Sequence, residues 1–361
     1  MSEVVDLFLE LAAIPSPSGE ERSVADVVTG YLHDLGLAHD EDEHGNIYAR
    51  IAPTTNGTPL FFCAHMDTVP PDGRLEPVLD DGVIRNAGGT ILGADDKSAI
   101  VAMLEGARRA LVEGRPHAGV ELLFTTSEEI GLVGAAAFDH TRLHARLGYV
   151  YDQAAPIGEI ILGAPWARRM DVAFHGRAAH SGMYPEEGRS AVQAAARAIA
   201  DLRLGRVDEE TTANVGLISG GTAANIVPEW CTFRAEARSH DERKLNDLVQ
   251  EMLEAFTFAA TQAECEVETN VRTQYRGYRF AKSDEVVRLA AGALERCGRT
   301  VSYALSGGAA DANALNERGL RCLNLANGME DIHTPKEHIS VDDLEGMVEV
   351  TLALVEGARA A

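Results

Sequence analysis

The chain has 361 residues, of which 45% are hydrophobic and 24% charged, a globular composition at a length that suits about two domains. Its formal net charge of −24 repels phosphate backbones and anionic lipids, so nucleic acids and membranes are poor partners. The 5 cysteines include no C-x-x-C pair, which argues against a disulfide framework or a thiolate zinc finger and indicates a reducing, cytoplasmic compartment.

The N-terminal part predicts alternating helices and strands. The first segment carries acidic residues where a signal peptide needs positive ones, and its apolar positions recur at helical spacing up to Pro15. No apolar run is long enough to cross a bilayer. A mostly parallel sheet with helices on both faces follows from this alternation. We expect helices at 21–36 and 96–113, strands at 46–52, 59–65, 119–129 and 147–152, and a hairpin at 77–86.

The pattern changes near Pro165. The next segments read as strand, helix, strand, strand, helix and strand, which is the order of a small two-layer α+β domain. From about Tyr275 the earlier alternation resumes and ends with a helix at 340–358. We therefore expect an α/β catalytic domain formed by residues 1–164 and 275–361, with a mostly parallel central sheet, and an inserted two-layer domain at 165–274.

Polar side chains with metal-binding chemistry follow several of the predicted strands. His65 and Asp67 are two positions apart at the end of an apolar run, so they point the same way. Asp95 and Asp96 precede a helix, and "TTSEE" and "YVYD" place further carboxylates after two more strands. Because ligands bind outside the carboxyl ends of strands in open α/β sheets, these side chains are expected to share one crevice.

Such a concentration of carboxylates is electrostatically costly, because neighbouring negative charges oppose one another. Divalent cations would remove this cost. Each cluster taken alone also fits a solvated surface loop. The late segment "DIHTPKEHI" adds His333 and His338, and imidazoles together with carboxylates suit Zn²⁺, Co²⁺ or Mn²⁺ better than Ca²⁺.

The motifs "AHMD", "GADDK", "TTSEE", "YVYD" and "IHTPKE", in this order, resemble the M20 family of di-metal peptidases and amidohydrolases. Within that family they are most similar to the tripeptidase branch, peptidase T and its relatives. The segments "GRAAHSGMYPEEGRSA", "GGTAANIVPEWC" and "EARSHD" resemble the family's lid and dimerisation domain, and "SGGAADAN" resembles a substrate loop. The likeness extends over nearly the whole chain.

The resemblance implies a role for each motif residue. Two divalent ions, zinc first and cobalt or manganese next, would activate a water molecule. Asp95 would bridge both ions, and the family commonly has a cis peptide after this residue. Glu128 would be the general base, and Asp67 would orient a ligand. One ion would be held by His65 and Asp152, and the other by His333 and Glu129.

The resemblance also implies substrate-binding residues. His180 would donate to the developing oxyanion, in many relatives from the partner subunit of a homodimer. Asn225 and Arg238 would hold the carboxylate of a short peptide, a task that suits the forked guanidinium group. Gly307 and Gly308 would let the substrate backbone approach closely. Without the resemblance, His180 also fits a buried structural histidine and Arg238 a surface ion pair.

Two departures from the family pattern concern specificity. Relatives often have Gly and Ser where this chain has Ala309 and Ala310, and the chain is shorter than the well-known tripeptidases. The expected function is metal-dependent hydrolysis of short peptides by an aminopeptidase. The alternatives are an amidohydrolase acting on N-acyl or N-carbamoyl amino acids, a carboxypeptidase-like enzyme and a peptide-binding protein without catalysis. His338 receives no role.

Overall fold

The fold is described from a computed structural model, which covers residues 2–359. The chain forms two compact units. Unit 1 consists of the residues up to Ala164 and from Tyr278 onwards, and unit 2 is Pro165–Gly277. The expected end of the insertion at residue 274 falls inside strand β13 (Glu266–Tyr275), which belongs wholly to unit 2.

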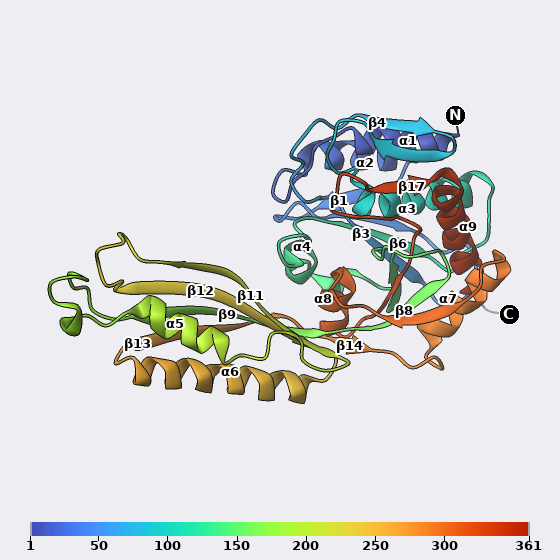
Figure 1. Ribbon diagram of the computed structural model, residues 1–361. Coiled ribbons are helices and arrows are strands. Elements are labelled where there is room, and N and C mark those ends of the chain that lie inside the picture. Colours follow the sequence, from blue (N-terminus) through green and yellow to red (C-terminus); the bar gives the residue numbers. More distant parts are fainter. Residues whose placement is uncertain (1, 360–361) are drawn as a thin grey trace. The chain divides into compact units, whose positions relative to one another are not determined.

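A nine-stranded mixed sheet forms the centre of unit 1 within the described residues (Figure 1). The strand order is β1-β2-β6-β3-β7-β16-β8-β14, and β15 also pairs with β8. The strands run over His39–Glu41 (β1), Ile47–Ile51 (β2), Leu60–His65 (β3), Val120–Thr125 (β6), Leu147–Val150 (β7), Glu159–Ala164 (β8), Tyr278–Arg279 (β14), Ser302–Leu305 (β15) and Arg321–Leu325 (β16). The parallel part, β6-β3-β7-β16, lies in the middle, and antiparallel pairs flank it. The expected mostly parallel arrangement therefore holds for the centre of the sheet.

Helices cover both faces of this sheet. Their bounds are Glu3–Ala12 (α1), Arg22–Asp34 (α2), Ala94–Val112 (α3), Val133–Ala137 (α4), Glu285–Arg296 (α7), Asp311–Glu317 (α8) and Val341–Gly357 (α9). On one face, Tyr149 donates to the Val286 carbonyl of α7 at 2.9 Å. On the opposite face, Cys63 of β3 donates to Asp311 of α8 at 3.6 Å. Helices α3 and α9 lie side by side (Figure 1).

The first helix illustrates how the sequence sets these elements. Ser2 caps α1, because its hydroxyl accepts from the Val5 backbone N–H at 3.4 Å. Val4, Phe8 and Leu11 recur at helical spacing and are buried in the core of unit 1. A polar residue at one of these positions would leave an unsatisfied group in the core, so the apolar spacing fixes which face of α1 packs inward.

A small second sheet in unit 1 has the order β17-β5-β4. Strands β4 (Pro77–Asp80) and β5 (Val83–Asn86) form the expected hairpin, and β17 is His338–Ser340. The turn residues Asp81 and Gly82 both have positive φ, 47° and 77°, which explains why an Asp-Gly pair occupies this turn. The pairing of β17 with β5 anchors the chain immediately after the segment that carries His333.

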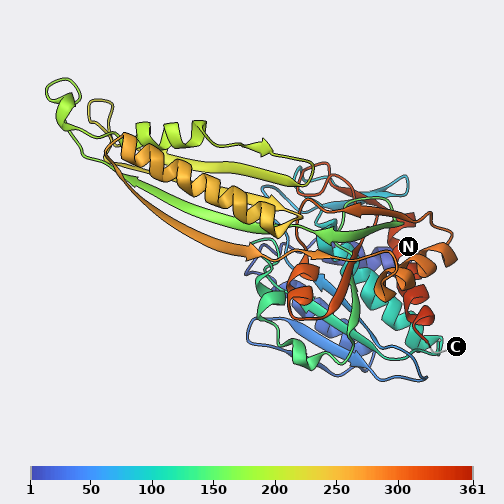
Figure 2. The same ribbon diagram turned by 90° about the horizontal axis from the view of Figure 1, so that it is seen from below.

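Unit 2 is a five-stranded antiparallel sheet with two helices on one face (Figures 1 and 2). Its elements are Trp166–His175 (β9), Ala191–Ala200 (α5), Gly205–Arg206 (β10), Thr211–Gly220 (β11), Trp230–Ser239 (β12), Glu242–Gln262 (α6) and β13. Met170, Val172 and Phe174 alternate along β9 and pack beneath the helices. The order of the long elements is the one that the sequence predicts.

The described residues contain no helix that is long and apolar enough to cross a membrane. The five cysteines, Cys63, Cys231, Cys265, Cys297 and Cys322, all carry free thiols. Three of these are buried and two are partly buried.

His117 gives unit 1 a pH-sensitive position away from the candidate site. The side chain is 2% exposed, and burial lowers its pKa below the usual value of a histidine. The unfolded chain therefore binds the proton more readily, and stability falls as the pH falls through about 6.5. We expect His117→Gln to lose less free energy of unfolding than the wild type between about pH 7.5 and 5.5 in urea titrations. The exposed His33→Gln is the control, and parallel pH curves for wild type and His117→Gln would refute this account.

Candidate metal centre

The candidate site lies at the carboxyl ends of three neighbouring parallel strands. In the order β6-β3-β7, these strands end at Thr125, three residues before Glu128, at His65, and at Val150, two residues before Asp152. Strands β6 and β7 each pair with β3 in parallel, so the three chain ends emerge at one edge of the sheet. This is the edge at which ligands bind in open α/β sheets.

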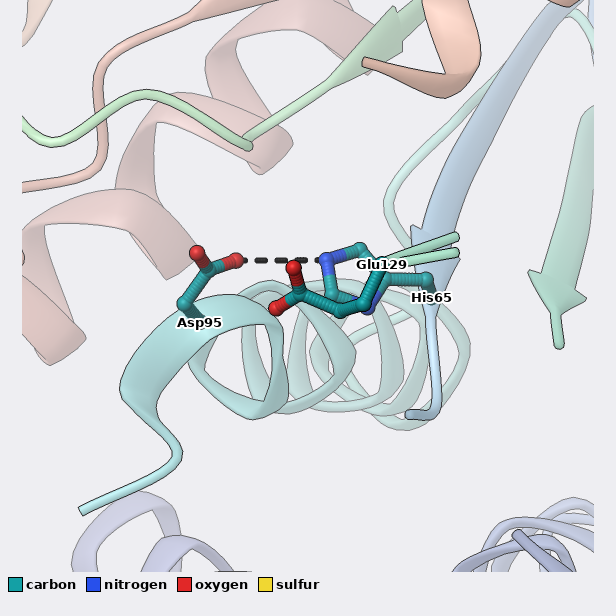
Figure 3. Close-up of side chains that lie close together, drawn as sticks. All are labelled: His65, Asp95 and Glu129. Atoms are coloured by element: carbon teal, nitrogen blue, oxygen red, sulfur yellow. Dashed lines mark hydrogen bonds and ion pairs between the residues drawn. The ribbon is translucent and has the colours of Figure 1, made fainter. Parts of the chain in front are cut away.

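Asp95 lies at the centre of the cluster. One carboxylate oxygen is 3.2 Å from the His65 Nε2 atom, and the other is 3.1 Å from the His333 Nε2 atom. The same His333 nitrogen is 2.9 Å from a carboxylate oxygen of Glu129. His65, Asp95 and Glu129 point toward one another and together could hold a metal ion (Figure 3). The two oxygens of Asp95 therefore face two different histidines, as a carboxylate that bridges two ions would.

Asp67 ties two of these strand ends together and is fully buried. Its carboxylate accepts the backbone N–H groups of Glu128 at 2.9 Å and Glu129 at 3.1 Å. One of its oxygens also lies 3.4 Å from the His65 Nδ1 atom, and Ser18 donates its hydroxyl at 2.6 Å. Asp67 thus fixes the orientation of the imidazole and of the turn that carries both glutamates.

The carboxylates of the cluster differ in the direction in which their surroundings shift the pKa. The His333 and His65 side chains hold the pKa of Asp95 well below its usual range, although burial opposes them. The neighbouring carboxylates in turn raise the pKa of His333 to about 10. Burial and the Asp152 charge raise the pKa of Glu128, and burial and Asp95 raise that of Asp152. The histidines therefore balance the negative charge with protons, which a divalent cation would displace on binding.

The structure adds two site residues that the sequence analysis did not identify. Asn324 of β16 accepts the Asp152 backbone N–H at 3.0 Å and donates to its carbonyl at 2.6 Å, which holds the end of β7. Asp311 is buried and accepts from Cys63 and Thr125, and burial raises its pKa to about 6. The link between Asn324 and Asp152 follows from the pairing of β16 with β7, and the sequence pattern does not give this strand order.

His333 reaches the cluster from a separate loop. Its side chain is 43% exposed, and its backbone adopts a left-handed conformation with φ of 62°. A β-carbon makes that conformation costly, so the loop around His333 must hold it in place. The expected cis peptide between Asp95 and Asp96 is present.

Comparison with known proteins decides the family. The peptidase dimerisation domain of M20 enzymes matches residues 167–264, and peptidase family M28 matches residues 46–156. The structure superimposes on aminopeptidase PepT from Bacillus cereus with a TM-score of 0.91 and 39% identity over 98% of both chains. A tripeptidase from Staphylococcus aureus gives a TM-score of 0.94 at 33% identity, covering 98% of this chain and 97% of the other.

The chain belongs to the M20 peptidase family. The curated relative YqjE of Bacillus subtilis is 37% identical and matches over 98% of both chains. Membership therefore covers both units of this M20 peptidase, and it agrees with the resemblance read from the motifs.

Two of the expected substrate residues of this M20 protein share one end of unit 2. His180 forms a bridge with Ile226, and the Ser181 backbone donates to the Asn225 carbonyl at 3.0 Å. His180 is exposed, so it is not the buried structural histidine that the sequence also allowed. Arg238 lies near the opposite end of β12 and pairs with Glu236 at 3.1 Å. Within one chain, unit 2 does not bring Arg238 together with the other two.

Gly307 and Gly308 lie between β15 and α8 in unit 1. The Gly308 backbone N–H donates to the Ser306 hydroxyl at 3.1 Å, which shapes the turn. Ala309 is partly buried and Ala310 is buried at the start of α8. Neither alanine offers a side-chain hydrogen bond to a substrate, in keeping with the departure noted in the sequence.

Proposed function

We propose that this protein is a di-metal aminopeptidase that hydrolyses short peptides, as a tripeptidase does. The observation that carries this proposal is the position of Asp95, whose two oxygens lie 3.2 and 3.1 Å from two different histidines. The relatives named PepT aminopeptidase and tripeptidase support the same activity. The fully buried Asp67, which orients His65 and both glutamates, is the support that a metal ligand set requires.

The residues present fit a pair of divalent ions. Two imidazole nitrogens and several carboxylate oxygens suit zinc, with cobalt or manganese as alternatives. Asp95 would bridge, His333 and Glu129 would hold one ion, and His65 and Asp152 the other. The 2.9 Å contact between His333 and Glu129 supports the first of these pairs. When bound, the ions would polarise the peptide carbonyl and lower the pKa of a water molecule, so that the hydroxide formed from it can attack the carbonyl carbon.

Glu128 is the best-placed general base. Among the described residues no side chain hydrogen-bonds to its carboxylate, whereas the Glu129 carboxylate contacts His333. Burial and Asp152 raise the pKa of Glu128, which makes its carboxylate a better proton acceptor. Its carboxylate oxygen would take the proton from the attacking water and deliver it to the leaving amine nitrogen. His180 would donate a hydrogen bond to the carbonyl oxygen as negative charge develops there.

The distance in unit 2 between Arg238 and the pair formed by His180 and Asn225 supports a homodimer. Strand β12 begins at Trp230, next to the loop that carries Asn225, and Arg238 lies near its other end. At about 3.3 Å per residue these positions are roughly 25 Å apart, too far to hold one short peptide. His180 and Asn225 would therefore serve the site of the partner subunit, while Arg238 would serve another site. The match of the dimerisation domain to residues 167–264 agrees with this arrangement.

A mixing experiment tests whether His180 acts in the partner's site. His180→Ala and Glu128→Gln should each be inactive alone. Heterodimers of the two would contain one site with both groups, so mixed and re-equilibrated protein should recover about one quarter of wild-type activity if pairing is random. No recovery despite demonstrated subunit exchange would place His180 and Glu128 in the same chain's site.

The substrate proposal is tested by digestion of a peptide library with zinc-, cobalt- or manganese-loaded protein, read by mass spectrometry. We expect release of N-terminal residues from short peptides with free amino groups and none from N-acetylated copies. Cleavage of blocked substrates alone would favour the amidohydrolase, and release from the C-terminus the carboxypeptidase-like enzyme. Tight binding without turnover would indicate a peptide-binding protein.

The free thiols of all five cysteines support a cytoplasmic location.

A further inference from the structure

Glu337 is a buried carboxylate that no step of the proposed mechanism uses. It is 2% exposed and lies four positions after His333 in the sequence. One of its oxygens accepts the backbone N–H groups of Leu92 at 2.8 Å and Gly93 at 3.0 Å. The other accepts the backbone N–H of Asp95 at 3.1 Å. A single side chain therefore holds three backbone groups of the segment that presents Asp95.

The segment around Glu337 is the one that carries His333. Glu330 and His338 close its base, because each backbone N–H donates to the carbonyl of the other, at 3.0 and 3.1 Å. Within it, the Glu337 backbone N–H donates to the Thr334 carbonyl at 3.1 Å. Residues 330–338, which we call the His333 loop, thus form a closed unit that contacts residues 92–95 through the Glu337 carboxylate as well as through the His333 side chain.

The His333 loop contains backbone strain that needs such an anchor. Asp331 and His333 both have positive φ, 52° and 62°. Non-glycine residues in this region are strained, and they persist only when surrounding contacts determine the conformation. Three backbone N–H groups donate to the Glu337 carboxylate and offset the cost of its burial, and the Lys97 side chain is buried nearby, where its Nζ atom donates to the Ile14 carbonyl at 2.6 Å.

We propose that Glu337 is a positioning residue of the metal centre, which fixes the distance between Asp95 and His333 by holding the His333 loop against residues 92–95. This inference rests on the proposed metal centre. The two loops are far apart in sequence, and Glu337 is the side chain that hydrogen-bonds from one to the other at three points. Loss of these bonds lets Asp95 and His333 move independently, so the ion that they share binds less tightly.

The test is the zinc affinity of Glu337→Gln, measured by competition with a chromophoric chelator. The amide keeps the side-chain length but places an NH₂ group against backbone N–H groups. We expect the zinc ion that Asp95 and His333 would share to bind about 10- to 100-fold less tightly, the range typical of residues that orient metal ligands. With excess zinc, kcat should recover while KM stays unchanged. The control is Glu330→Gln in the same loop, whose exposed carboxylate lies 3.8 Å from His338 and should leave the affinity unchanged.

The outcomes separate this inference from the proposed function. If wild-type protein binds no zinc, the metal centre itself is wrong. If the wild type binds zinc and folded Glu337→Gln binds it equally well, Glu337 only stabilises the fold and the positioning role is wrong. Should Glu337→Gln fail to fold, Glu337→Asp decides, because it keeps the charge but is too short to reach all three N–H groups. Wild-type zinc affinity in that variant would also overturn the proposal.

Discussion

Replacing Glu128 by glutamine should lower kcat by about 10²- to 10⁴-fold while the protein keeps its bound metal, because the amide cannot accept the proton of the attacking water. The backbone N–H of Glu128 donates to Asp67, and its side chain is free of hydrogen bonds to other described side chains, so the substitution leaves the turn intact. Steady-state kinetics and metal analysis on the same sample measure both quantities. A kcat within a few-fold of the wild type would remove Glu128 as the base.

The adjacent residue provides the matched control. Glu129 contacts His333 at 2.9 Å, so Glu129→Gln should lose metal as well as activity. The pH profile adds a second criterion. Burial and Asp152 raise the pKa of Glu128, and the base works only when deprotonated. The wild-type kcat/KM should therefore fall on acidification at a pH above the usual carboxyl value of about 4.3, and Glu128→Gln should lack this limb.

Asp95→Asn should abolish activity and weaken metal binding by more than about 100-fold, beyond the range typical of residues that only orient ligands. A bridge needs two anionic oxygens, and asparagine supplies one neutral oxygen. In the structure each Asp95 oxygen faces its own histidine, so the substitution replaces one of these two oxygens with an NH₂ group and removes the negative charge that both share. Isothermal titration of zinc into the metal-free variant measures the loss, and far-UV circular dichroism checks the fold.

Asp96 is the control for this prediction, because it is the next residue and fully buried. Burial raises its pKa, and a neutral amide of the same size fits this buried position. Asp96→Asn should bind zinc with wild-type stoichiometry. Equal zinc affinity in Asp95→Asn and wild type would show that Asp95 does not bridge.

The proximity of the candidate ligands could be predicted from the sequence because the strands that precede His65 and Glu129 are easily recognised. Residues 60–65 and 120–125 are fully buried along their length, and the polar side chains come where each apolar run ends. The end of a short buried strand can be located in the sequence where its apolar run stops, and the carboxyl ends of neighbouring parallel strands lie at the same edge of the sheet. His65, Asp95, Glu129 and His333 accordingly lie together, as the motifs indicated.

Strand direction could not be predicted in the same way. β8, Glu159–Ala164, is short and mostly apolar, and it was not identified in the sequence. It runs antiparallel to β16 and parallel to β15. When helices cover both faces of a sheet, a buried strand has the same apolar pattern in either direction, so the sequence pattern does not distinguish a mixed sheet from a parallel one.

The supporting residues were missed for a related reason. Glu337 reaches Asp95 across 242 sequence positions, and Asn324 reaches Asp152 across 172. No periodicity connects such pairs, because their contact depends on the tertiary arrangement of loops. In the sequence, Asn324 is a polar residue in an apolar strand and Glu337 is part of the motif "IHTPKE". The backbone groups that each of them holds are known only from the fold.

The most direct test of the account is the anomalous scattering of zinc in crystals of the zinc-loaded protein. We predict two peaks at the carboxyl edge of the central sheet of unit 1, one on each side of the Asp95 carboxylate. One peak should contact His65 and Asp152, and the other His333 and Glu129. A single peak, or peaks that Asp95 does not touch, would contradict the two-ion centre on which the proposed hydrolysis depends.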